Sequence, residues 1–336
     1  MEPLTSVTPL LEVHGLRVAL SAGRGSASVV DGLSFGLKPG QTLTLVGESG
    51  CGKTMTALAL MRLLPPAAAI AAGSIQLADR DLAALPESAL RDLRGNQMAM
   101  IFQEPMTSLN PVLTVGEQIA EAAMIHQQLS LGEALSRAAE MLKLVHIPSP
   151  ETALRRYPHE LSGGMRQRAM IAMALMCRPK LLIADEPTTA LDVTVQAQIL
   201  ALLRRLQREL QMALLLITHD LGVVAEMADQ VAVMYAGQII EQAEVRELFS
   251  HPKHPYTVGL FGSLPQRVAV GAIHELPLRP ARLKPIAGSV PSPFDLPSGC
   301  RFWPRCPQVF DRCKTDAPEL TEAAPGHAAA CWLMAR

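Results

Sequence analysis

Residues 47–54 read GESGCGKT, and they restrict the possible folds of this chain more than any other segment. An apolar run, TLTLV at 42–46, precedes them, and the segment 53–63, which contains no Gly or Pro, follows. The pattern G-x-x-x-x-G-K-[ST] between a strand and a helix is typical of a loop whose backbone N–H groups bind phosphate oxygens. The sequence therefore predicts a strand, a phosphate-binding loop and a helix in succession.

Different residues of this loop are expected to bind different parts of a nucleoside triphosphate and its metal ion. Lys53 is expected to neutralise the β- and γ-phosphates, and the Thr54 hydroxyl to bind Mg²⁺, a hard cation that prefers oxygen ligands. The glycines let the backbone turn with its N–H groups inward. The predicted phosphate ligands are Gly47, Glu48, Ser49, Gly50, Cys51, Gly52, Lys53 and Thr54.

Further short apolar runs predict a largely parallel sheet that is buried on both faces. The expected strands are 42–46, 98–102, 181–185 and 214–218. The segments 165–177 and 194–211 contain no Gly or Pro, and we expect them to be crossover helices. Buried strands alternating with helices are typical of an α/β fold with helices on both sides of the sheet.

The apolar run 181–185 ends in two acids, in the sequence LLIADEP. At the tip of a strand, Asp185 is positioned to bind Mg²⁺ directly or through water. Glu186 is positioned to orient and polarise an attacking water molecule. With a phosphate loop upstream, this pair predicts hydrolysis of the bound triphosphate.

Length and composition limit the domain organisation and the partners. A chain of 336 residues exceeds the ~250–300 residues at which a single core stops growing. The segment 112–160 has no apolar run typical of a strand, so we expect a mostly helical insertion there. Beyond about residue 250 the composition changes, and repeated prolines at 277, 280, 285, 291, 293 and 297 predict a linker into a small C-terminal module. Lys and Arg number 30 against 31 Asp and Glu, so no overall basic field predicts nucleic-acid binding.

The beginning of the chain predicts a cytoplasmic protein. Glu2 stands where a signal peptide would carry Lys or Arg, and no sustained apolar centre follows. The longest uncharged stretch in the first hundred residues, 63–78, is shorter than the ~20 apolar residues of a membrane span and contains Pro65, Pro66 and Gly73. We expect no membrane-spanning segment.

Four of the six cysteines lie close together in sequence near the C-terminus. Cys300, Cys306, Cys313 and Cys331 have the spacing C-x5-C, C-x6-C and C-x17-C. In a cytoplasmic chain disulfides are rare, and four thiolates bind either Zn²⁺ or an iron–sulfur cluster. Zinc usually brings a short C-x2-4-C pair, which is absent here. Four unrelated buried thiols are the remaining alternative.

The segment LSGGMRQR at 161–168 resembles the signature motif of the ABC ATPase family. Other motifs follow the family order: Gln103 in FQEP resembles the Q-loop, Asp192 in TALD the D-loop, and His219 in LLLITHD the switch histidine. The resemblance implies an α/β fold of the P-loop NTPase class. It implies an ABC ATPase domain at 1–250 with a helical insertion at about 104–165, and a small Pro- and Cys-rich C-terminal domain at 251–336.

The same resemblance implies roles for these residues with ATP and Mg²⁺ as cofactors. Ser162, Gly163 and Gly164 would contact ATP bound by an opposite ATPase domain. Asp192 would belong to the ATP-binding residues, and His219 would contact the γ-phosphate. Gln103 would touch Mg²⁺ or the attacking water and sense the permease. Two residues depart from the family pattern. Leu20 replaces the usual adenine-stacking aromatic, so we expect looser discrimination between ATP and GTP. Cys51 replaces a usual serine, and we expect it to be sensitive to alkylation.

Segments near the C-terminus narrow the resemblance to the ATP-binding subunits of the dipeptide/oligopeptide permease family. They read HPKHPYTVGLF at 251–261, PIAGSVPSP at 285–293 and GCRFWPRCPQVFDRC at 299–313, together with FQEPMTSLNP at 102–111. This resemblance implies that Cys300, Cys306, Cys313 and Cys331 bind a [4Fe–4S] cluster.

A resemblance to this family implies an ATPase that energises uptake of dipeptides or oligopeptides. Its implied partners are a paralogous ATPase in a heterodimer, two transmembrane permeases and an extracytoplasmic binding protein, at the cytoplasmic face of the inner membrane. Nickel complexes, glutathione or antimicrobial peptides are alternative cargoes. A soluble ABC ATPase of DNA repair or translation is a remote alternative, because the chain has no long coiled coil and no second phosphate loop.

Overall fold

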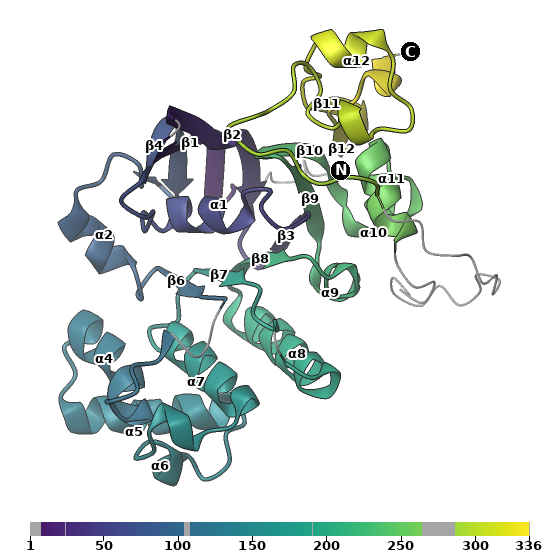
Figure 1. Ribbon diagram of the computed structural model, residues 1–336. Helices are drawn as coiled ribbons and strands as arrows, with labels where there is room; N and C mark the ends of the chain where they lie inside the picture. Colours follow the sequence, from purple (N-terminus) through teal and green to yellow (C-terminus); the bar gives the residue numbers. More distant parts are fainter. Residues whose placement is uncertain (1–7, 24, 104–107, 190, 264–285, 336) are drawn as a thin grey trace, which may run out of the picture. The chain divides into compact units, whose positions relative to one another are not determined.

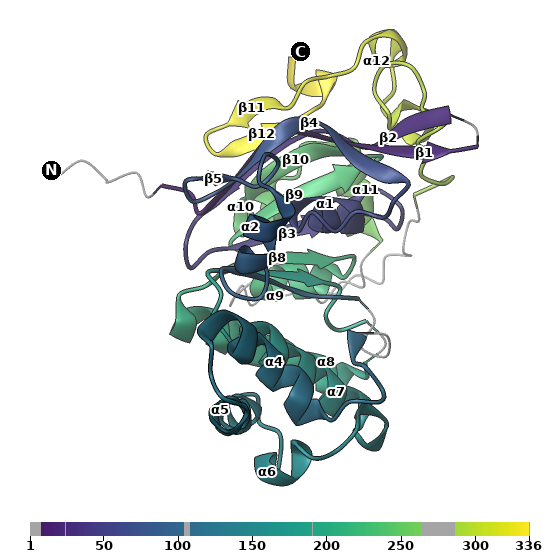
Figure 2. The same cartoon turned by 90° about the vertical axis from the view of Figure 1, so that its left-hand side faces the viewer.

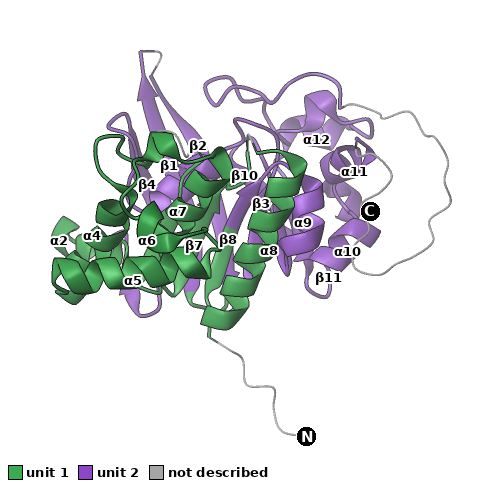
Figure 3. Ribbon diagram, turned by 90° about the horizontal axis from the view of Figure 1, so that it is seen from below, with its two compact units in different colours: residues 1–10, 38–41, 84–215 green, residues 11–37, 42–83, 216–336 purple. Residues whose placement is uncertain are grey.

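The computed structural model describes residues 8–23, 25–103, 108–189, 191–263 and 286–335. By its internal contacts the chain divides into two compact units, drawn in different colours in Figure 3. Unit 1 comprises residues 1–10, 38–41 and 84–215, and unit 2 comprises residues 11–37, 42–83 and 216–336. This division concerns compactness alone, and the domain boundary expected near residue 250 stays a prediction.

Unit 2 contains an antiparallel sheet that sequence analysis had not resolved. Its strands lie in the order β2-β1-β4-β5. They are β1 (Leu11–Ala22), β2 (Gly25–Leu37), β4 (Ala68–Leu77) and β5 (Arg80–Asp81). Helix α1 (Lys53–Leu60) contacts β1, β2 and β4, and Figure 1 shows it beside them. The strands contribute fully buried apolar side chains, such as Leu11, Leu16 and Leu33.

A second set of strands in unit 2 lies in the order β11-β12-β10-β9-β3. They are β3 (Thr42–Val46), β9 (Gln230–Tyr235), β10 (Gln238–Glu244), β11 (Thr321–Ala324) and β12 (His327–Ala329). Strands β3 and β9 are parallel, and the other neighbours are antiparallel. All five residues of β3 are buried, as its uninterrupted apolar run predicts. Strand β8 (Ala213–Thr218) runs across the division between the units.

The C-terminal residues share a core with these strands. Phe302 is fully buried and contacts Tyr235 of β9 and Tyr256, with ring centroids 5.2 Å and 5.4 Å away. The helices of this region are α9 (Leu221–Met227), α10 (Val245–Ser250), α11 (Pro255–Gly262) and α12 (Asp311–Thr315), with 3₁₀ turns at Trp303–Arg305 and Trp332–Ala335. The described part of 251–336 belongs to unit 2, and its residue Phe302 shares a core cluster with residues of β9 and β10. Of the prolines expected to form a linker, those at 277, 280 and 285 lie outside the described residues, and Pro291, Pro293 and Pro297 lie within them.

Unit 1 is mostly helical, as expected for 112–160. Helices α4 (Val115–Gln127), α5 (Leu131–Leu144) and α7 (Gly163–Leu175) contact one another, and Figure 2 shows them grouped with α6 (Pro150–Ala153). The unit also contains α2 (Glu87–Leu93), α8 (Val193–Leu210), a 3₁₀ turn at Pro158–Glu160, and the parallel strands β6 (Met98–Ile101) and β7 (Leu181–Asp185). Capping boxes begin α4 at Thr114 and α5 at Ser130.

The expected helices exist, but their ends are shifted by one to three residues. Helix α1 stops at Leu60, short of the expected 63, and Arg62 adopts a left-handed backbone with φ 53°. Helix α8 is closed by Gln211, with φ 51°, and begins after the cap Asp192. A left-handed residue that is not glycine leaves little sequence signal, so these ends were predicted poorly. Among the described helices, none is both long and apolar enough to span a bilayer.

Candidate phosphate loop, acidic pair and cysteine pocket

The phosphate loop connects β3 to α1, and two of its glycines are required by close backbone contacts. A Cβ on Gly47 would lie 2.3 Å from the carbonyl oxygen of Met234. A Cβ on Gly52 would lie 2.6 Å from that of Val29, and its φ is 107°. Both positions therefore require glycine for reasons of space, and Gly52 requires it for its left-handed backbone conformation as well. The motif predicted the glycines, but not the neighbours that enforce them.

Lys53 lies folded over this loop. Its side chain is buried, and Nζ donates to the carbonyl oxygens of Gly47 and Glu48 at 2.8 Å and 3.0 Å. A cation is therefore placed among the backbone groups of the loop at the start of α1, where helix N–H groups favour an anion. Thr54, in the first turn of α1, is exposed, so its hydroxyl is accessible to an ion.

Cys51 does not have the environment of a reactive thiol. Its side chain is fully buried. Burial raises the pKa of this thiol, although the Lys53 cation, with Nζ 3.7 Å from Sγ, acts in the opposite direction. Alkylation requires an accessible thiolate, so the expected alkylation sensitivity of Cys51 is wrong. The sequence showed the residue beside Lys53 but not its burial.

In unit 1, the side chains of Glu186 and Gln103 are in direct contact, and their roles toward a water molecule stay predictions. Gln103 Nε2 donates to Glu186 Oε2 at 3.1 Å, and Thr189 Oγ1 donates to the same oxygen at 2.8 Å. Parallel pairing of β6 with β7 brings the ends of these strands together. Glu186 adopts φ 47°, a strained backbone of the kind found at functional sites. Asp185 beside it is buried at the end of β7.

The segment 161–168 and Asp192 also meet within unit 1. Ser162 is the N-cap of α7 and accepts from the Met165 N–H, while Asp192 is the N-cap of α8 and accepts from the Val195 N–H at 2.9 Å. A Cβ on Gly164 would lie 2.8 Å from Val195 Cγ1, so the two helix starts are close. Capping accounts for the local positions of both side chains. Their roles toward a nucleotide stay predictions.

The predicted ATP-site residues fall into one group in each unit. In unit 2 are the loop residues 47–54 and His219, which is exposed and directly follows β8. In unit 1 are Gln103, Ser162, Gly163, Gly164, Asp185, Glu186 and Asp192. Leu20, at the position expected to stack on adenine, lies partly buried in β1. The joint site of the two groups stays a prediction.

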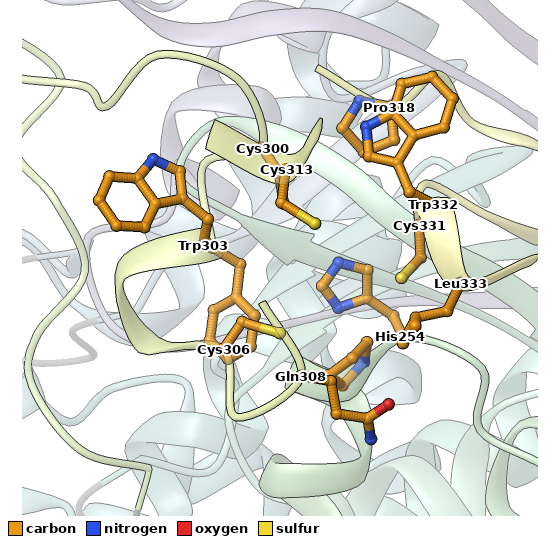
Figure 4. A pocket seen from close by; sticks show the side chains of 12 residues that line it. His254, Cys300, Trp303, Cys306, Gln308, Cys313, Pro318, Cys331, Trp332 and Leu333 are labelled. Carbon is orange, nitrogen blue, oxygen red and sulfur yellow. The ribbon is translucent and has the colours of Figure 1, made fainter. Parts of the chain in front are cut away.

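Cys300, Cys306, Cys313 and Cys331 line a single pocket of unit 2 together with His254 (Figure 4). Burial raises the pKa of Cys300, Cys306 and Cys331, the last to about 11. Without a bound cation these thiols are therefore protonated at neutral pH. Among the described residues, no three His, Cys, Asp or Glu side chains are arranged so that they would hold a metal ion. The structure thus gathers the four cysteines without forming a metal centre, and the expected cluster stays a prediction.

Sequence analysis missed a contact between the C-terminal region and the phosphate loop, inside unit 2. Arg305 Nη1 and Nη2 donate to the two carboxylate oxygens of Glu48, each at 3.1 Å. The Glu48 N–H donates to Tyr256 Oη at 3.0 Å. Nearby, Arg301 pairs with Asp31 of β2. No local pattern connects residues separated by 257 positions, so the sequence offered no signal for this contact.

Comparisons with known proteins agree over nearly the whole chain. Residues 30–189 match the family model described as ABC transporter, and residues 240–313 match the model described as oligopeptide/dipeptide transporter, C-terminal region. A probable peptide ABC transporter ATP-binding protein of Sinorhizobium fredii is 52% identical, covering 96% of this chain and 94% of that protein. The oligopeptide transport ATP-binding protein AppD of Bacillus subtilis is 50% identical, covering 97% of both.

Solved structures support the same fold. A dimeric post-hydrolysis state of the ATP-binding cassette MJ0796, bound to ADP and Pi, superimposes with a TM-score of 0.64 at 24% identity and covers 70% of this chain and 99% of that one. CbiO1 of Clostridium perfringens, part of an ABC transporter complex, gives 0.61 at 27% identity and covers 75% and 95%. At the identity of the first structure, the likeness concerns the fold alone.

Proposed function

Because this chain belongs to the ABC transporter family of ATP-binding proteins, we propose that it hydrolyses ATP to drive uptake of dipeptides or oligopeptides. The observation that carries the proposal is the match of residues 240–313 to the C-terminal region of oligopeptide/dipeptide transporters. AppD of Bacillus subtilis and OppD of Salmonella typhimurium, both oligopeptide transport ATP-binding proteins, are 50% and 49% identical to it.

In this proposal, the phosphate loop neutralises the negative charge of the ATP phosphates. Lys53 exchanges its two carbonyl partners for the β- and γ-phosphate oxygens, and the backbone N–H groups at the start of α1 bind the remaining charge. The Thr54 hydroxyl and the Asp185 carboxylate would hold Mg²⁺, which would supply positive charge to offset the charge that develops on hydrolysis.

Glu186 acts as the base that orients and polarises the attacking water. Its carboxylate is already held by Gln103 and Thr189 through hydrogen bonds to one oxygen. Holding a base in one orientation lowers the entropic cost of reaching the transition state. We further propose that His219 contacts the γ-phosphate, and that Ser162, Gly163, Gly164 and Asp192 contact ATP held by the opposite ATPase subunit.

We propose that this subunit works as a heterodimer with a paralogous ATPase, on two permeases served by an extracytoplasmic binding protein. The place of action would be the cytoplasmic face of the inner membrane. Residues 104–125 are the proposed permease contact, of which 104–107 lie outside the described residues. The remainder carries exposed apolar side chains, which suit a protein contact: Val112, Leu113, Met124 and Ile125.

Removing the gene from a cell that has no other importer of this class should reduce uptake of a labelled dipeptide to the background level. Expression of the unchanged chain should restore it, because permeases without their ATPase have no source of energy for uphill transport. Nickel and glutathione uptake, measured in the same strains, should stay constant. Loss of nickel or glutathione uptake with normal dipeptide uptake would instead assign the alternative cargo.

We also propose that Cys300, Cys306, Cys313 and Cys331 bind a [4Fe–4S] cluster. Their positions around one pocket support this proposal, since soft thiolate ligands suit iron–sulfur clusters and zinc. When bound, such a group would cross-link the segments that carry the cysteines and add a redox-active centre. The protonated thiols would each have to lose a proton on binding, so loading should be favoured at higher pH.

The anaerobically purified chain should contain iron and acid-labile sulfide, and Cys313→Ser should remove most of both. The expected cause is loss of one of four ligands, which the neighbouring side chains do not replace. Cys177→Ser is the matched control, because Cys177 is also buried but does not line the pocket, and it should keep the full iron content. Zinc in place of iron would overturn the assignment of an iron–sulfur cluster. An absence of any metal from freshly purified protein would overturn the assignment of either metal to these cysteines.

A further inference from the structure

The phosphate loop contains one acidic side chain, Glu48, and a distant arginine holds it. The Arg305 guanidinium donates to both carboxylate oxygens of Glu48, at 3.1 Å each. The Arg305 side chain is only 5% exposed, compared with 30% for Glu48. A bidentate pair of this kind fixes orientation as well as charge, because the planar guanidinium matches the planar carboxylate.

The position of Glu48 makes its charge important for anion binding. Its own carbonyl oxygen lies 3.0 Å from Lys53 Nζ, the cation proposed to bind the β- and γ-phosphates. The Glu48 carboxylate belongs to the same residue, so only the length of the Glu48 side chain separates it from the backbone group that Lys53 contacts. Left unpaired, it would compete for Lys53 and repel a triphosphate, since like charges interact strongly at short range in a partly buried site. In the structure Arg305 binds the carboxylate, and Lys53 stays on backbone carbonyls.

Arg305 is itself held in place from several sides. Its Nε donates to the Ala287 carbonyl oxygen at 2.8 Å, and Nη1 also donates to Tyr235 Oη at 3.3 Å. The guanidinium carbon lies 5.7 Å from the centroid of the Tyr235 ring and 6.0 Å from that of Phe302. The Glu48 backbone is held independently by Tyr256 Oη. The guanidinium is thus presented to Glu48 in a fixed position.

We infer that Arg305 is a positioning residue of the ATP site: it holds the Glu48 carboxylate away from Lys53, so that the phosphate loop receives ATP with its cation available. This inference rests on the ATP binding proposed above. The residue does not touch the nucleotide and acts through Glu48 alone. The C-terminal region thereby sets the affinity of a loop that lies far from it in sequence.

The alternative is that Arg305 merely fills space between aromatic rings, and the two explanations predict different results in a double-mutant cycle. If Arg305 acts through the charge of Glu48, removing that charge should make Arg305 dispensable for ATP binding. If Arg305 acts by packing, Glu48→Gln should leave the defect of Arg305→Met unchanged. The coupling between two mutations isolates the pairwise interaction from independent structural effects.

The experiment measures the affinity of the full-length chain for a fluorescent ATP analogue with Mg²⁺. Arg305→Met should weaken binding by about tenfold or more, the usual effect of losing a hydrogen-bonded partner of a charge. Arg305→Met with Glu48→Gln should regain affinity to within about threefold of the unchanged chain. The defect of Arg305→Met should also shrink as salt is raised, because screening weakens the repulsion.

Arg301→Met is the matched control. Arg301 also lies in the C-terminal region and beside a cysteine, and it forms an ion pair with Asp31 without contacting Glu48. Its replacement should cost folding stability but leave nucleotide affinity nearly constant. Equal iron content in all variants would exclude an effect through the cysteine pocket. Should Arg305→Met fold poorly, Arg305→Lys keeps the charge without the bidentate geometry and should give a smaller, salt-sensitive loss.

Three results would overturn the inference. Arg305→Met binding as tightly as the unchanged chain would show that Glu48 needs no partner. A double variant as weak as Arg305→Met would assign Arg305 to packing. Both leave the proposed ATPase intact, provided that the unchanged chain binds the analogue. Failure of the unchanged chain to bind it would overturn the proposed function together with this inference.

Discussion

Glu186→Gln should reduce ATP turnover by about a hundredfold to ten-thousandfold while ATP binding stays normal, the range expected for losing a general base. The amide keeps the shape of the side chain but is far too weak a base to polarise water. The Thr189 hydroxyl still has an oxygen to donate to, so the local structure around residue 186 should be preserved. The variant should therefore accumulate as an ATP-bound, closed dimer.

Phosphate release by the assembled transporter, with nucleotide binding measured on the same preparations, provides the test. Glu209→Gln is a matched control, because it makes the same chemical change on the exposed face of α8, where Glu209 contacts only Arg205 among the ion pairs of the described residues. It should hydrolyse ATP at the normal rate. Undiminished turnover of Glu186→Gln would place hydrolysis in the composite site whose base comes from the partner ATPase.

Gly47→Ala should abolish nucleotide binding and also destabilise the fold. The new Cβ would lie 2.3 Å from the Met234 carbonyl oxygen and 2.8 Å from Cys51 Sγ. Met234 belongs to the buried strand β9, whose backbone has no room to retreat, so the loop must move instead. Overpacking of this kind costs about 1–3 kcal/mol, and the displaced loop loses its N–H groups as phosphate ligands.

Urea unfolding and the fluorescent ATP analogue together test this second prediction. Gly23→Ala is the control in the same unit, since a Cβ there meets no atom within 4 Å and the backbone conformation is ordinary. That variant should unfold at the same urea concentration as the unchanged chain and bind nucleotide normally. Normal nucleotide binding by Gly47→Ala would show that the backbone of β9 can move to accommodate the new Cβ. That result would remove the steric reason for glycine at this position.

Local patterns predicted the elements of this chain well because each has its cause within a few residues. The run 42–46 became β3, and 181–185 became β7, at the expected residues. The resemblance to the ABC ATPase family, rather than any local pattern, singled out the glutamine after β6, and Gln103 contacts Glu186 in the structure. The parallel strand pairing that joins them follows from the α/β pattern itself.

Features that depend on distant parts of the chain could not be predicted in this way. The partner of Glu48 is Arg305, 257 positions further along the sequence, and the burial of Cys51 leaves no signal in the loop motif. The antiparallel sheet of β1, β2, β4 and β5 contains no strand that is buried throughout, which was the signal for the strands that were predicted. Spacing predicted that the four cysteines would gather, but the width of the pocket depends on how α11 and both 3₁₀ turns pack around them.

The contact between Glu48 and Arg305 has a consequence for the moment at which a newly made chain becomes competent. The two residues are separated by 257 positions, which a ribosome adding about 5–20 residues per second crosses in about 13–50 s. During that interval the loop has been synthesised but lacks both Arg305 and Phe302, whose ring centroid lies 6.0 Å from the Arg305 guanidinium carbon. Prematurely terminated chains would therefore carry the complete loop motif with its acidic side chain unpartnered, and would compete poorly with finished subunits for the cell's ATP.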